Sequence, residues 1–190
     1  MVKKIVGTGV LLVLALALQA GVKMYTLKSP DGKVKLEVTA GQGIAYSLFY
    51  DGRLLLKPSR IALHTDLPEA DHWENIRITG TKQRHVSETV QAPFYRVKEF
   101  GIDCNELELR LNNGFLLLMR AYNDGMAYRF VAGRKGEMTV VEERAEFNFA
   151  DDFEAYIPYS TNPKDPWNMA FQNFYTKAPL TQYNTELPAF

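Results

Sequence analysis

Residues 106–130, ELELRLNNGFLLLMRAYNDGMAYRF, decide the fold class, because they alternate apolar and polar side chains around two turn signals. Strict alternation over several residues is typical of a β-strand with one wet face. We therefore expect three leucines of this stretch to be buried and the polar residues between them to be exposed. The buried set is Leu107, Leu109 and Leu111, and the exposed set is Glu106, Glu108 and Arg110.

Two tripeptides divide this stretch into three strands: Asn-Asn-Gly at 112–114 and Asn-Asp-Gly at 123–125. Asn and Asp tolerate a positive φ and Gly adopts it freely, so both tripeptides predict hairpin turns. Asp-Gly at 51–52 predicts another hairpin within IAYSLFYDGRLLLKPS at 44–59. Short strands joined by such turns indicate antiparallel pairing.

The same period of two recurs elsewhere in the chain. KVKLEVTA at 33–40 places Val34, Leu36 and Val38 on one face, and VVEERAEFNF at 140–149 is a further candidate strand. Residues 64–75 read as a loop between strands. These patterns predict an all-β antiparallel β-sandwich.

Helical signals are weak throughout. No stretch from 25 to 165 keeps helical periodicity for three turns, and one short helix is expected near Trp167 to Phe174. The final TQYNTELPAF ends without a closing strand, so we expect the sandwich, residues 25–190, to be incomplete at its C-terminal end; a natural terminus is the alternative.

Residues 1–20 form a separate segment. MVKK is a short basic start, and an uncharged apolar run follows it, ending in small residues suited to cleavage after Ala17 or Ala20. This pattern predicts a secretory signal peptide. The alternative is a membrane anchor, but the run of about 16 residues is shorter than the roughly 20 that a spanning helix needs.

Composition excludes several classes of function. The 190 residues carry 22 basic and 22 acidic side chains without a basic stripe, which argues against a nucleic-acid partner. Cys104 stands alone, so it forms no intrachain disulfide, and we expect a small buried side chain rather than a nucleophile.

Candidate chemical groups are few. His64, Asp71 and His72 match no zinc spacing and read as solvated loop residues. The doublets at 142–143 and 151–152 are acidic, but neighbouring residues of a strand point to opposite faces and do not converge. Aromatic residues such as Trp73 and Trp167 are candidates for stacking on sugars, although aromatic side chains in sandwiches usually belong to the core.

Four stretches together resemble the N-terminal domain of glycoside hydrolase family 97. They occur in the family's order and cover most of residues 27–160: LKSPDGKVKLEV, YSLFYDGRLLLKPSRIAL, YRVKEFGIDCNELELRLNNGFLLLMRAYNDGMAYRFV, and EERAEFNF followed by AYIPY. The resemblance implies a large super-sandwich, of the galactose-mutarotase type, that packs on a catalytic (β/α)8 barrel. In that setting Arg120 and Arg129 are framework or interface residues.

The resemblance also implies an activity that this chain lacks by itself. Family members are α-glucosidases and α-galactosidases whose catalytic carboxylates belong to the barrel, so no catalytic residue is assigned here. They bind calcium near the active site, and one glutamate ligand comes from the N-terminal domain. The matching position is Gln172, which departs from the pattern; nearby oxygen donors that could substitute are Asp165, Asn168 and Asn173.

Two functions therefore stand. The first is the accessory N-terminal domain of a secreted exo-acting α-glycosidase, exported to the periplasm of a Gram-negative bacterium, with an α-glycoside as substrate and no membrane contact after cleavage. The second is a free-standing carbohydrate-binding or adhesin-like sandwich without enzymatic activity. The coding sequence after Phe190 would discriminate between them.

Overall fold

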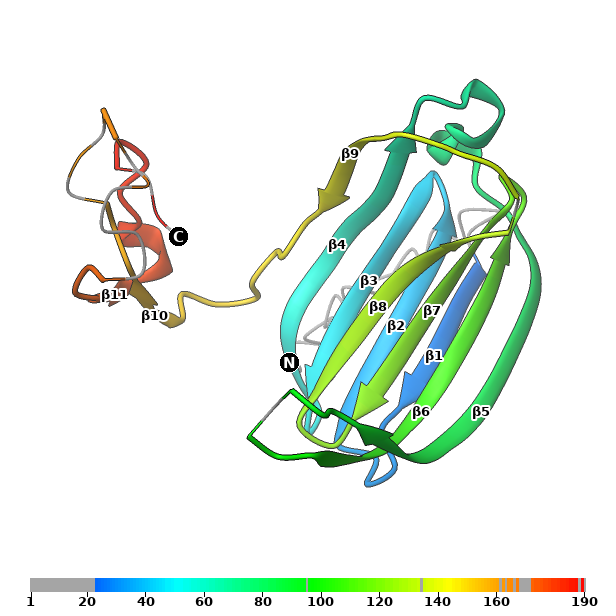
Figure 1. Ribbon diagram of the computed structural model, residues 1–190, viewed down its shortest axis with the longest axis horizontal. Helices are drawn as coiled ribbons and strands as arrows, with labels where there is room; N and C mark the ends of the chain where they lie inside the picture. The colour runs from blue at the N-terminus through cyan, green and yellow to red at the C-terminus, as the bar shows by residue number, and fades with distance from the viewer. Residues whose placement is uncertain are drawn as a thin grey trace, which may run out of the picture.

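Two antiparallel sheets face each other in the computed structural model (Figure 1). The structure describes residues 23–94, 96–133, 135–160, 162, 164–165, 167, 172–187 and 189. The five-stranded sheet has the order β1-β2-β3-β4-β9, and the four-stranded sheet has the order β5-β6-β7-β8. Their strands are β1 (Lys23–Lys28), β2 (Val34–Gly41), β3 (Gly43–Tyr50), β4 (Arg53–Thr65), β9 (Val140–Ala145), β5 (Ile78–Gln91), β6 (Glu99–Leu111), β7 (Phe115–Tyr122) and β8 (Gly125–Ala132).

The predicted hairpin turns are confirmed. β3 and β4 are joined at Asp51 and Gly52, which have φ values of 48° and 79°. β6 and β7 are joined at 112–114, where Gly114 has a φ of 86°. β7 and β8 are joined by the two residues at 123–124. The turn signals in the sequence therefore set the order of the strands.

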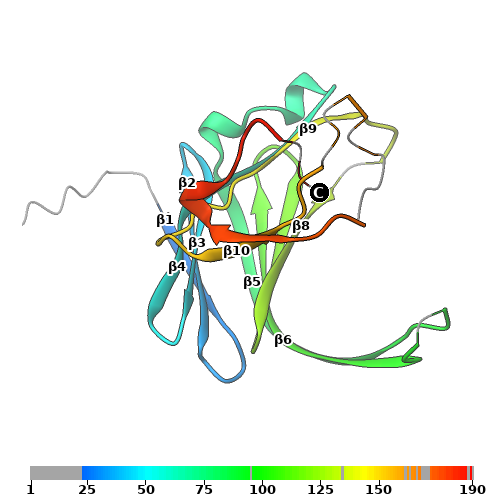
Figure 2. The same cartoon turned by 90° about the vertical axis from the view of Figure 1, so that its left-hand side faces the viewer.

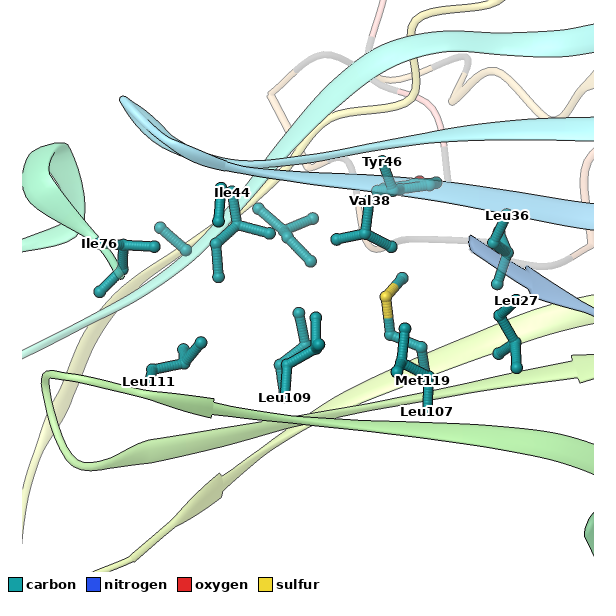
Figure 3. Packing of buried hydrophobic residues seen from close by; sticks show 14 of the residues in the cluster. Leu27, Leu36, Val38, Ile44, Tyr46, Ile76, Leu107, Leu109, Leu111 and Met119 are labelled. Atoms are coloured by element: carbon teal, nitrogen blue, oxygen red, sulfur yellow. The ribbon is translucent and has the colours of Figure 1, made fainter. Parts of the chain in front are cut away.

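The core lies between the two sheets. Figure 3 shows Leu36, Val38 and Tyr46 of the five-stranded sheet facing Leu107 and Met119 of the four-stranded sheet. Full burial of one such side chain contributes about 1.5–3 kcal/mol. The predicted inward sets of β2 and β6 are confirmed, because these residues are at most 5% exposed: Val34, Leu36, Val38, Leu107, Leu109 and Leu111.

The connection between β4 and β5 covers one end of the sandwich. The predicted loop at 64–75 is partly wrong, because β4 continues to Thr65. Two short 3-10 turns follow it, η1 (Pro68–Ala70) and η2 (Trp73–Asn75). Trp73 is buried, and its Nε1 donates to the carbonyl oxygen of Leu63 at 3.0 Å. Its ring stacks edge-on against Phe130, so the loop adds to the core rather than to a binding face.

The candidate strand at 140–149 is confirmed only over residues 140–145, which form β9. β9 pairs with β4, and the residues after it follow the same edge, where Lys57 N donates to Asn148 O and Ala150 N donates to Leu55 O. The chain then leaves the sandwich. A separate two-stranded sheet pairs β10 (Glu154–Ile157) with β11 (Thr176–Pro179), which precedes η3 (Leu180–Gln182).

Two predictions at the ends of the chain are only partly tested. The signal peptide lies outside the described residues. Half of the short helix expected near Trp167 to Phe174 falls on residues 168–171, also outside the described residues. The described residues at 167 and 172–174 are not helical. No helix in the described ranges is long and apolar enough to cross a membrane.

Candidate functional site

The hairpin of residues 120–130 is tied to the turn at residues 29–32. Asp31 N donates to Asn123 Oδ1 at 3.0 Å. The Asp31 carboxylate accepts hydrogen bonds from Ser29 Oγ at 2.6 Å and Lys33 N at 3.0 Å, and these bonds hold its pKa below the usual range. The two turns are 92 residues apart in sequence. Their contact fixes the end of the four-stranded sheet to the β1–β2 turn.

Glu106 lies between two arginines on the outer face of the four-stranded sheet. The expectation that it is exposed is wrong, because only 4% of its surface is accessible. Its Oε1 accepts from Arg84 Nε and its Oε2 from Arg120 Nε, both at 2.7 Å. The register explains the contact, because Arg84 on β5 and Arg120 on β7 are its cross-strand neighbours. Arg120 therefore has the framework role that was one of its two expected roles.

The network of Glu106 and its two arginines, Arg84 and Arg120, stays ionised. Burial alone would raise the pKa of Glu106, but the hydrogen bonds from Arg84 and Arg120 outweigh burial and hold the pKa below its usual range. The pKa of Arg120 is raised by hydrogen bonding to Tyr122 and Glu106. A carboxylate held ionised between two guanidinium groups is a poor general acid. The cluster is suited to organising a surface rather than to proton transfer.

Sequence reasoning missed this network because Arg84 and Glu106 are 22 residues apart. The one feature of the sequence that could have indicated the network is that Glu106 and the two arginines have opposite charges and lie on neighbouring strands. Cross-strand pairing becomes visible only when the register is known, because a shift of one residue moves each side chain to the other face. Arg129 of β8 lies on the same outer face, two strands from Glu106, and is exposed.

A polar hollow of about 520 Å³ lies where η2 meets the edges of β3, β4 and β9. His64 Nδ1 and Asp71 Oδ1 are 2.7 Å apart at its wall, and Arg60 and Arg144 also line it. His72 lines a different hollow, so the two histidines do not converge. Trp73 is buried beneath the hollow and offers no ring face for stacking on a sugar.

The two acidic doublets separate for different reasons: Glu142 and Glu143 alternate on β9, whereas Asp151 and Asp152 lie outside the strands, so the strand argument does not apply to them. Glu143 accepts a hydrogen bond from Tyr128 Oη at 3.2 Å, while its neighbour Glu142 is exposed on β9. Asp151 pairs with Arg53, and Asp152 accepts from the backbone and hydroxyl of Thr181. Neither doublet presents two carboxylates to one point.

Gln172 is exposed in an irregular segment before β11. Of the expected substitutes, Asp165 is exposed, Asn173 is half-buried with an Nδ2 atom that has no hydrogen-bond partner, and Asn168 lies outside the described residues. Calcium takes about six to eight oxygen ligands. Among the described residues, no three His, Cys, Asp or Glu side chains gather into a metal-binding group.

Comparison with known proteins finds a matching family and two curated relatives. Residues 27–189 match the family described as glycosyl-hydrolase 97 N-terminal. A retaining α-galactosidase of Bacteroides thetaiotaomicron is 38% identical over 177 residues, which is 90% of this chain and 26% of that protein. A probable retaining α-galactosidase of Streptomyces bingchenggensis is 26% identical and matches 81% of this chain and 24% of that protein. The chain thus spans about a quarter of these relatives.

Solved structures share the fold at lower identity. A β-arabinopyranosidase is 21% identical with a TM-score of 0.66, over 80% of this chain and 26% of that one. A glycoside hydrolase family 97 enzyme from Pseudoalteromonas sp. strain K8, in complex with acarbose, is 16% identical with a TM-score of 0.64, over 82% of this chain and 24% of that one. The antiparallel sandwich predicted from the sequence is confirmed.

Proposed function

This chain belongs to the glycosyl-hydrolase 97 N-terminal family, and from that premise we propose that it is the accessory domain of a longer, exported, retaining α-galactosidase. The observation that carries the proposal is the 38% identity, over nine-tenths of this chain, to a retaining α-galactosidase. The second curated relative is named for the same activity. The sequence alone left α-glucosidase and α-galactosidase activity open, and the names of these two relatives favour α-galactosidase.

The division of labour follows from the chemistry of glycoside hydrolysis. Retention needs two carboxyl groups about 5–5.5 Å apart across the scissile bond. In the described residues the acidic doublets diverge, and Glu106 is occupied by two arginines. We assign both catalytic carboxylates to a barrel domain of the same polypeptide. The sandwich then supports that domain rather than reacting with the substrate.

The test is to assay the whole polypeptide and this 190-residue chain on 4-nitrophenyl α-galactoside and α-glucoside. The whole polypeptide is expected to prefer the galactoside and to release the α-anomer first, which NMR detects before mutarotation. The 190-residue chain is expected to show no turnover. Turnover by this chain, or a stop codon after Phe190, would reject the proposal, and the latter would favour the free-standing sugar-binding sandwich.

Gln172 is the one residue of this chain that we propose as a calcium ligand in the whole enzyme. Gln172 offers a neutral carbonyl oxygen where the resemblance places a carboxylate, so it would contribute one ligand and no charge. We expect calorimetry to detect no calcium binding to this chain and binding to the whole enzyme. Gln172→Ala is expected to weaken that binding. Unchanged affinity in the variant would remove Gln172 from the ligand set.

Export follows from residues 1–20. The basic start, apolar run and small residues support cleavage by a signal peptidase. Mass spectrometry of protein recovered from the periplasm is expected to show a mature start at Leu18 or Gly21. An intact Met1 on exported protein would contradict this part of the proposal.

A further inference from the structure

Two polar hollows beside the β2–β3 turn join into one groove. The hollow of about 520 Å³ at η2 and a second one of about 530 Å³ have four lining residues in common. Figure 2 shows η1 and η2, in teal, at the same end of the sandwich as the β2–β3 turn. The groove therefore begins at η2 and continues across the outer face of the five-stranded sheet. The common residues are Gln42, Gly43, Arg60 and Arg144.

Small side chains form part of the floor of this groove. Thr39 pairs with Ala45, and Ala45 pairs with Arg60, so these three side chains share one face of neighbouring strands. That face is the outer one, because Ile44, the neighbour of Ala45, is buried in the core. Two short side chains beside a long one leave a depression in the sheet surface, with Arg60 at its side.

Glu146 fixes the side of the groove that follows β9. Its Oε2 accepts hydrogen bonds from Arg60 N at 3.0 Å and Asn148 Nδ2 at 3.2 Å. Its Oε1 accepts from Arg144 Nε at 2.8 Å. The bonds from Arg60 and Arg144 hold the pKa of Glu146 below its usual range, so this carboxylate stays ionised. Only the backbone of Arg60 is used here, and its guanidinium group has no partner among the described residues.

η2 and the residue before its cap add hydrogen-bond acceptors. Glu74 and Asn75 line the hollow and are exposed, and the Glu74 carboxylate has no partner in the part of the chain that the structure describes. Asp71 uses Oδ1 for His64 Nδ1 at 2.7 Å and keeps Oδ2. Gln42 adds an amide that both donates and accepts. Donors and acceptors, with charges of both signs, therefore line the same space.

We propose that this groove binds a neutral saccharide. A sugar hydroxyl donates one hydrogen bond and accepts others, so adjacent hydroxyls need donors and acceptors together. Planar guanidinium, carboxylate and amide groups can each hold two neighbouring hydroxyls. An anionic ligand would meet the carboxylates of Asp71 and Glu74, and a cationic ligand would meet Arg60 and Arg144. An uncharged, polyhydroxylated ligand avoids both conflicts.

The groove has room for an oligosaccharide. Each of its two hollows is within the range of about 300–1,000 Å³ that is common for small-molecule sites. Trp73 lines the groove but is buried, so hydrogen bonds rather than ring stacking carry recognition. A dissociation constant on the order of 1 mM is expected, because these groups are exposed and water competes for them. The site goes beyond the proposed function, which gives the sandwich a supporting role.

The test titrates neutral trisaccharides into the isotope-labelled 190-residue chain and follows its backbone amide resonances by NMR. Raffinose, which ends in an α-galactosyl group, and maltotriose are the two neutral probes. Trigalacturonate is the anionic probe of the same length. Both neutral probes are expected to cause saturable shifts at residues 42–45 and 73–75, and trigalacturonate is expected to bind more weakly than either.

Two substitutions each remove one hydrogen-bonding group from the groove, Arg60→Ala a donor and Glu74→Ala an acceptor. Lys57→Ala is the matched control, because Lys57 is an exposed basic residue of β4 that lines neither hollow. All three variants are expected to keep the melting temperature of the wild-type chain, since none of these side chains is buried. Each groove variant is expected to weaken binding at least about fivefold, the loss of one hydrogen bond. The control is expected to leave binding unchanged.

Saturable binding of either neutral probe that the groove variants weaken supports the site. The proposal would be overturned by the absence of saturable shifts with both neutral probes, by unchanged binding in both groove variants, or by an equal loss in Lys57→Ala. Tighter binding of trigalacturonate would overturn the neutral ligand class. Each of these results leaves the proposed function standing, because that function is tested by turnover in the whole polypeptide.

Discussion

The two halves of β6 differ in the direction that their apolar residues face. From Asn105 onward Leu107 and Leu109 fill the sandwich core, whereas Phe100 and Ile102 lie on the outer side of the same strand. Both halves alternate with a period of two. The phase of the alternation, rather than its period, therefore identifies which side of a strand is covered. A change of phase marks the place where the strand leaves one core.

The outer face of β6 contains a second contrast. Glu106 and Glu108 are two residues apart on one face, yet their side chains are 4% and 22% exposed. Glu106 is opposite arginines on both neighbouring strands, whereas Glu108 is opposite Lys82 and Leu118. Burial on an outer face thus depends on cross-strand neighbours.

The largest expected change in the free energy of unfolding comes from a substitution in the inner half of β6. Leu109→Ala should lower the free energy of unfolding by about 2–5 kcal/mol, because it leaves a cavity in a closed core. Phe100→Ala should cost no more than about 1 kcal/mol in this chain, because that side chain is already 40% exposed. Urea unfolding measures both values. Similar costs would show that both halves of β6 belong to the same core.

The next effect concerns the buried carboxylate. Glu106→Ala should cost about 1–3 kcal/mol, because Arg84 and Arg120 lose their common acceptor. The cost stays below that of a fully buried ion pair, since Arg84 is more than half exposed and can turn to water. Glu106→Gln keeps the shape and should cost less. A cost within about 0.5 kcal/mol for Glu106→Ala would show that the network is an ordinary surface pair.

The same carboxylate gives a pH dependence. The pKa of Glu106 is lowered in the folded protein, so its stabilising contribution is present above the ordinary value of about 4.5 and is lost as the pH falls through the folded pKa. Asp31, Glu146 and Asp152 are shifted in the same direction. The measurement is therefore the difference in unfolding free energy between wild type and Glu106→Gln. It should shrink below pH 4.5, and a constant difference would argue against an ionised Glu106.

The smallest effect is expected at Glu108. Its partner Arg110 is exposed and lies on the same strand, with Nε at 3.0 Å from Oε1. Glu108→Ala should change the free energy of unfolding by no more than about 0.5 kcal/mol. Measured beside Leu109→Ala under the same conditions, it checks the register of β6. Equal costs at the two positions would mean that the pairing is displaced by one residue.

Much of the sandwich was predictable from local sequence. The Asn-Gly and Asp-Gly turns identified the hairpins, and the leucines at 107, 109 and 111 identified the inner face of β6, because both signals act between residues close in the chain. The strand at 140–145 was recognisable for the same reason. Cys104 was correctly expected to be buried, as a small apolar side chain usually is.

The sequence by itself determined which residues form strands, where the chain turns and which side of most strands is apolar, because these depend on dihedral preferences and a period of two. Tertiary structure alone decided that Glu106 is buried, that Asp31 binds Asn123, and that Trp73 enters the core. Each of these results depends on which segment lies opposite a given side chain. Pairing partners are separated by tens of residues, and local alternation carries no information about their register.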